Sequence, residues 1–147
     1  MLARLASWRT LKSGVLLFWA AWFTIVLLAN LCDALKAGRV LPAGWTLSSG
    51  NWELMLKVTA VHATPVAVVG IMFLGVIAWQ AAAGILFWRA WAAGGRGWIS
   101  AFIVGLALWA AFALADELFL AYTIEVVHLR LFGLQLVSVL ALRLLPE

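Results

Sequence analysis

The strongest constraint on the fold is a set of predominantly apolar segments, each long enough to cross a lipid bilayer. A membrane-spanning helix needs about 20 such residues, and segments of this kind cover residues 13–33, 65–88, 98–121 and 124–144. Hydrophobic residues make up 67% of the chain and charged residues only 11%. A soluble domain could not bury so much apolar surface, whereas lipid accepts it on the outside of a bundle. The sequence therefore predicts an all-α, polytopic membrane protein: one domain over residues 1–147 with a bundle of four transmembrane helices.

One apolar stretch, residues 58–88, is longer than a single span requires. Thr64 and Pro65 divide it, and threonine at an N-cap followed by proline at the first helical position is a helix-start signal. We expect a short interfacial helix over residues 51–63 between the first two spans, with the second span starting at Pro65. The alternative is one long helix that kinks at the proline.

The positively charged residues are distributed unequally between the two sides of the predicted membrane. The side that carries the N-terminus has six positive residues: Arg4, Arg9, Lys12, Arg89, Arg96 and Arg143. The other side has four: Lys36, Arg39, Lys57 and Arg130. This bias predicts that both termini are cytoplasmic, and we expect the chain to lie in a bacterial inner membrane. We expect the first span to be uncleaved, because its apolar run is longer than that of a typical signal peptide and no small-residue cleavage site follows it. The basic residues form no run, so we expect no nucleic acid partner.

Most of the reactive side chains fall at the periplasmic ends of these predicted spans. Five of the six carboxylates lie there, together with both histidines: Asp33, Glu53, Asp116, Glu117, Glu125, His62 and His128. Two histidines at similar depth could supply the axial ligands of a haem b, so His62 and His128 are candidate cofactor ligands. Glu125 and His128 form a Glu-x-x-His motif, which together with Glu117 makes a candidate metal site. A plain network of paired interfacial groups without a cofactor is the interpretation that we favour.

The last two spans are joined by a short connection and should form an antiparallel hairpin. A turn near Tyr122 and Thr123 would bring Glu117 to the same depth as His128. Arg130 would then be close enough to pair with Glu117 or with the neighbouring carboxylate. In the third span, alanines at every fourth position from Ala107 form a small-residue stripe that permits close approach of another helix. The tryptophans inside spans are expected to face lipid or partner subunits: Trp19, Trp22, Trp79 and Trp109.

Short motifs resemble an uncharacterised family of bacterial predicted small integral membrane proteins. The matching features are Asn30-x-x-Asp33 at the end of the first span, Ser49-Gly50-Asn51 followed by an aromatic residue, and the acidic-aromatic segment Asp116-Glu117-Leu118-Phe119. The resemblance implies four spans and no assigned activity. From the residues alone, we expect Asn30 to cap the first span or to bond across to another helix.

The middle of every span lacks an ionisable residue, and the strongest deep polar groups are Gln80 and Gln135. Ion-coupled transporters usually place an ionisable group near the midplane. We therefore expect a non-catalytic accessory subunit of a larger membrane complex, respiratory or photosynthetic, whose partners are integral membrane subunits and lipids. The alternative is a protein that binds haem b or a divalent metal. A small transporter is a third hypothesis, and it requires a water-filled cavity that reaches Gln80 or Gln135.

Overall fold

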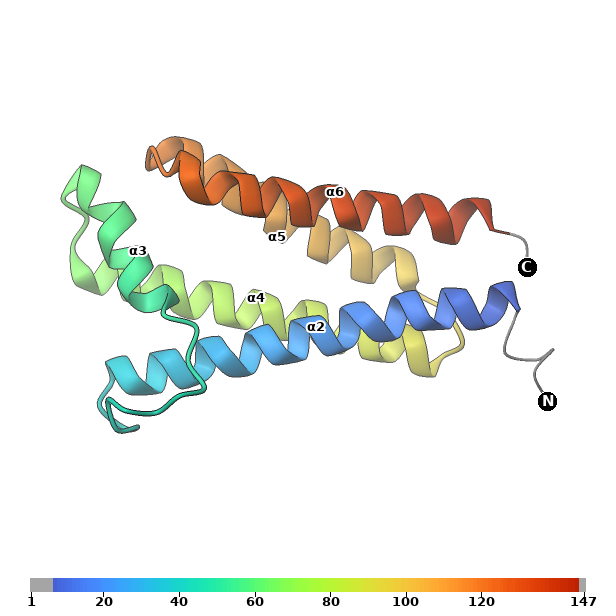
Figure 1. Cartoon of the computed structure of the whole chain (residues 1–147), viewed down its shortest axis with the longest axis horizontal. Coiled ribbons are helices and arrows are strands. Elements are labelled where there is room, and N and C mark those ends of the chain that lie inside the picture. Colours follow the sequence, from blue (N-terminus) through green and yellow to red (C-terminus); the bar gives the residue numbers. More distant parts are fainter. Residues whose placement is uncertain (1–6, 146–147) are drawn as a thin grey trace.

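The computed structural model describes residues 7–145, and this part of the chain is helical with short connections. Four long helices lie side by side along one axis (Figure 1): α2 (Trp8–Ala37), α4 (Val66–Ala92), α5 (Trp98–Leu118) and α6 (Tyr122–Leu144). Each is long and apolar enough to cross a membrane. The predicted four-helix membrane bundle is confirmed. Helix α2 begins earlier than the predicted span because Ser7 caps it, its hydroxyl accepting a 3.2 Å hydrogen bond from the backbone N–H of Thr10.

A separate short helix lies between the first two long ones. It consists of α3 (Asn51–Thr59) and a single 3₁₀ turn, η1 (Ala60–His62). Ala63 then takes a left-handed backbone conformation with φ of 50°, which ends this helix. Helix α4 starts at Val66, directly after Pro65. Of the two alternatives that the sequence left open, the structure therefore has two helices rather than one kinked helix, and α4 starts one residue later than expected.

The core is aromatic and lies where α2, α4 and α5 meet. Phe23 of α2 stacks on Phe87 of α4 at 5.5 Å between ring centroids and on Trp109 of α5 at 5.9 Å. Phe87 also meets Phe102 edge to face at 4.9 Å. Aromatic pairs of this kind add roughly 0.5–1.5 kcal/mol each beyond the burial of their area. Trp19 and Trp109, which we expected to face lipid or a partner, are instead buried in this core.

Helix α6 is the least covered of the four. It packs mainly along α5, and only Gln135 and Leu142 are buried among its 23 residues. In its most apolar 18-residue window 6% of the residues are buried, against 22–28% for the other three helices. The close approach to α5 occurs at Gly105, where an added Cβ would lie 2.7 Å from the side-chain amide of Gln135. Of the predicted alanine stripe, Ala107 is exposed, whereas Ala111 and Ala115 are half-buried.

Candidate functional site

Most of the predicted site residues lie at the end of the bundle that carries α3 and the α5–α6 turn (Figure 1). The start of α2 and the end of α6 lie at the opposite end. Four groups of polar contacts occupy the α3 end, centred on Asp33, Asn30, His128 and His62.

Asp33 holds the connection between α2 and α3. Its carboxylate accepts hydrogen bonds from the hydroxyls of Ser48 and Ser49, at 2.8 and 3.0 Å, and from the backbone N–H of Trp52 at 2.7 Å. Gly50, the N-cap residue of α3, has φ of 72° and no side chain that could satisfy the first N–H groups. Asp33 therefore serves as the anionic cap of α3 from another helix, where the helix dipole favours negative charge.

Asn30 lies one helical turn before Asp33 and connects three helices. Its side-chain N–H donates to the amide oxygen of Gln80 in α4 at 2.8 Å, and its oxygen accepts a 2.8 Å bond from the side chain of Asn51 at the start of α3. Asn30 and Gln80 are 1% and 2% exposed, so the bond between them is sealed from solvent, whereas Asn51 is half-buried. Asn30 thus bonds across helices and does not cap its own helix.

These contacts give a physical role to two of the motifs on which the family resemblance rests. The Asn30-x-x-Asp33 motif and the segment from Ser49 to Asn51 bond directly to each other. The bond between Gln80 and Asn30 was not predicted from the sequence. The sequence feature that could have indicated this bond is the amide of Gln80 deep within an apolar span, because such a group needs a hydrogen-bond partner inside the bundle.

His128 bonds to Asp116, and this pair connects α6 with α5. The His128 Nδ1 lies 2.5 Å from the Asp116 carboxylate, and the two side chains are 17% and 10% exposed. The imidazole stacks on Phe112 at 4.5 Å and on Trp109 at 6.2 Å between centroids. We expected Glu117 to meet His128, but Glu117 is exposed. Neighbouring residues point about 100° apart around a helix, so only one of the two acidic residues can face α6.

The α5–α6 turn sets this register. It is short, with residues 119–121 between the helices, and Leu120 takes a left-handed conformation with φ of 56°. The Ala121 N–H bonds back to the Asp116 carbonyl at 2.7 Å, which closes the last turn of α5. The predicted turn lay near Tyr122, and this residue instead begins α6.

His62 holds η1 against the same turn. Its Nε2 lies 2.8 Å from the backbone carbonyl of Leu118, one of the last carbonyls of α5, and its ring lies 5.6 Å from the Phe119 ring. His62 is exposed, whereas His128 is partly buried between helices. Each histidine therefore uses one ring nitrogen to hold a different part of the α5 terminus. The haem hypothesis, which needs the two imidazoles to face a common ligand, stays a prediction.

The remaining predicted ligands gather only loosely. Glu125 lies within electrostatic range of Glu117 and Asp116. Arg130, which we expected to pair with one of these carboxylates, is exposed, and His128–Asp116 is the one ion pair among residues 7–145. Within the same residues, no three His, Cys, Asp or Glu side chains are arranged so that they could hold a metal ion. The metal site at Glu117, Glu125 and His128 stays a prediction.

No protein-family model, curated protein or solved structure matches this chain. Its function therefore has to be inferred from the geometry of its own residues. That geometry consists of carboxylates, amides and imidazoles that bond to helix ends or to one another. Such an arrangement fixes the relative positions of helices.

Proposed function

We propose that this chain is a non-catalytic accessory subunit of a larger complex in the bacterial inner membrane, respiratory or photosynthetic. Both termini lie in the cytoplasm, and the Asp33, His62 and His128 contacts lie on the periplasmic side. The observation that carries the proposal is that the polar side chains best suited to chemistry are already bonded within the fold. Asp33 accepts three hydrogen bonds, and His62 and His128 each bond to the end of α5.

The uncovered side of α6 supports a role in assembly. Its outer face is a continuous apolar surface formed by exposed residues at helical spacing: Leu134, Val137, Leu140 and Leu144. Apart from its contacts with α5, α6 has one side-chain hydrogen bond to the bundle among residues 7–145. The hydroxyl of Ser138 accepts this bond from the indole N–H of Trp19 at 3.0 Å. Helices in membranes associate through close packing and interhelical hydrogen bonds. A helix that is supported mainly from one side can gain such packing from a partner helix.

The distribution of positive charge supports the orientation. Within residues 7–145, the end of the bundle where α2 begins has five basic residues and no carboxylate: Arg9, Lys12, Arg89, Arg96 and Arg143. The other end has four basic residues beside the acidic ones: Lys36, Arg39, Lys57 and Arg130. Lysine and arginine near span ends favour the cytoplasmic side, and acidic residues count for little.

A second candidate function is cofactor binding at His128. A histidine that ligates a metal typically bonds through its other ring nitrogen to a carboxylate, and Asp116 occupies that position at Nδ1. Nε2 of His128 would then be the ligating atom. An absorbance spectrum and metal analysis of the purified chain test this candidate directly. Transport has less support, because Gln80 and Gln135 are only 2% and 0% exposed and neither lines a space that water can enter.

Site-specific photo-crosslinking tests the accessory role. A benzophenone amino acid replaces Val137 on the outer face of α6, and in a matched control it replaces Ile71 on α4; the two residues are 62% and 72% exposed. After irradiation of intact cells, we expect Val137 to form a discrete adduct with another membrane protein and Ile71 to react mainly with lipid. Adducts only with lipid at both positions, or only with a second copy of this chain, would contradict the proposal.

A further inference from the structure

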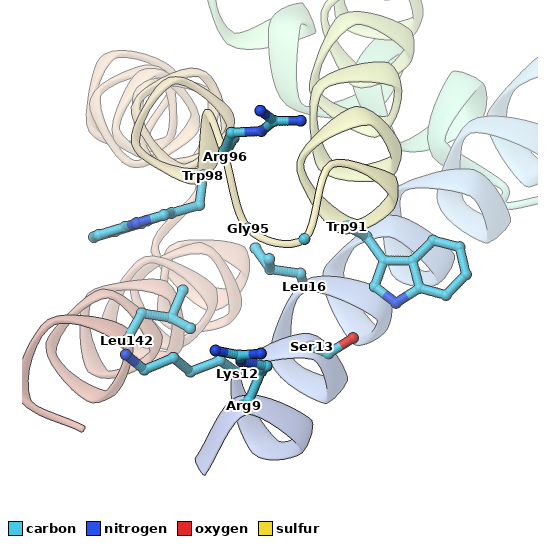
Figure 2. Close-up of a pocket in the computed structure, with 10 residues that line it drawn as sticks. Arg9, Lys12, Ser13, Leu16, Trp91, Gly95, Arg96, Trp98 and Leu142 are labelled. Carbon is cyan, nitrogen blue, oxygen red and sulfur yellow. The ribbon is translucent and has the colours of Figure 1, made fainter. Parts of the chain in front are cut away.

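A pocket lies at the end of the bundle opposite the site just described. Its volume is about 500 Å³, within the range of small-molecule sites. Three segments that are distant in sequence form it: the first turns of α2, the α4–α5 connection and the last turns of α6. Figure 2 shows Arg9 and Lys12 on the α2 side of the pocket, whereas the side chain of Arg96 lies beyond the turn at Gly95 and points away from them.

Within residues 7–145, no carboxylate lies near the cations of this pocket. Arg9 and Lys12 are three residues apart on one helix face, a spacing at which like charges destabilise a helix. All carboxylates among residues 7–145 lie at the other end of the bundle: Asp33, Glu53, Asp116, Glu117 and Glu125. The pocket cations thus form no ion pair with any described carboxylate. An anion bound between them would relieve this repulsion.

The other lining residues indicate what the anion belongs to. Leu16 and Leu142 line the pocket from α2 and α6, and both are buried. Trp91 and Trp98 line it from either side of the α4–α5 connection. Tryptophan is characteristic of the headgroup layer of a membrane. A ligand with a charged phosphate and an apolar remainder matches this combination better than free phosphate does.

We propose that this pocket binds the phosphate of an anionic phospholipid, with Arg9 and Lys12 as the phosphate contacts. Basic pockets between transmembrane helices on the cytoplasmic side are known to hold such headgroups. The site is independent of the proposed accessory role, because it needs no partner protein.

Native mass spectrometry of the full-length protein tests the site. The measured quantity is the dissociation constant of the first bound lipid, for phosphatidylglycerol and for phosphatidylcholine in the same detergent. We compare R9Q/K12Q with R89Q/R143Q, a control that removes the same charge from the same end of the bundle but outside the pocket. One surface cation corresponds to a roughly fivefold change in affinity for an anionic lipid. We therefore expect R9Q/K12Q to bind phosphatidylglycerol about 30-fold more weakly and the control to change less than about twofold.

Two further arms keep the test decisive. The single variants R9Q and K12Q should each weaken the binding of phosphatidylglycerol about fivefold, which covers the case in which R9Q/K12Q fails to fold. Inorganic phosphate alone should not displace the lipid. Equal losses in R9Q/K12Q and R89Q/R143Q, or equal affinities for the two lipids in the unaltered protein, would overturn the proposal. Displacement by inorganic phosphate would also overturn it, because the pocket would then be a site for free phosphate.

Discussion

Replacing Asn30 by leucine is expected to destabilise the bundle because it removes the centre of a buried amide chain. Leucine has the same branching and the same number of side-chain heavy atoms as asparagine, so the shape of the side chain is kept, although two methyl groups are larger than the amide oxygen and nitrogen. The substitution removes the bonds to Gln80 and to Asn51, both 2.8 Å long. Gln80 is 2% exposed, and its amide oxygen would be left without a partner inside the bundle.

The size of the effect follows from this burial. An interhelical hydrogen bond in a membrane protein contributes on average about 0.6 kcal/mol, and a buried polar group without a partner costs about 1–3 kcal/mol. We therefore expect N30L to lower the free energy of unfolding by about 2 kcal/mol, and Q80M by about 1.5 kcal/mol. In N30L/Q80M both bonding groups are gone, so the double variant should lose about 2 kcal/mol rather than the sum of the two.

The assay is reversible unfolding from mild detergent into sodium dodecyl sulfate, followed by tryptophan fluorescence. The double-mutant cycle isolates the coupling between the two side chains, which we expect to be about 1.5 kcal/mol. Strict additivity of N30L and Q80M would refute the reasoning, because it would mean that the two amides do not depend on each other in the folded protein.

Two further predictions concern backbone positions and use the same assay. G105A should lower the free energy of unfolding by about 1–3 kcal/mol, because its Cβ would lie 2.7 Å from the buried amide of Gln135. In G75A the added Cβ has no atom within 4 Å, so this variant should raise the free energy of unfolding by up to about 1 kcal/mol. Equal effects of the two variants would contradict this account. L120G should raise stability by about 0.5 kcal/mol, because Leu120 holds φ of 56° and glycine adopts that conformation without strain. A loss of stability in L120G would indicate that the leucine side chain contributes more than the strain removes.

Apolar segment length was sufficient to predict the fold. The four long helices were predictable because each must satisfy its own backbone in lipid, and this requirement does not depend on how the helices pack. The separation of α3 from α4 was predictable from Pro65, because a proline disfavours the helical conformation in the residue before it. The exact residues at which η1 and α5 end could not be predicted. These ends depend on left-handed backbone conformations at Ala63 and Leu120, and neither alanine nor leucine favours that region.

The contacts in the candidate site were harder to predict. From the sequence, His128 was expected near Asp116 and Glu117. Which of the two faces it depends on how α5 is rotated about its axis, because neighbouring residues point about 100° apart around a helix. The Asn30–Gln80 bond joins residues 50 apart in sequence. Spacing within a segment carries no information on such a contact. The close approach of α5 and α6 at Gly105 was not predicted for a similar reason. The alanine stripe can be read from the sequence of one helix, whereas the contact at Gly105 also depends on Gln135 of the other helix.

The most direct test of the central claim is the mass of the intact assembly that contains this 16.0 kDa chain, extracted in mild detergent and measured by native mass spectrometry. The account predicts a single assembly in which the chain is present at fixed stoichiometry with other integral membrane proteins. A chain that is recovered only alone, or only with copies of itself, would contradict the accessory role.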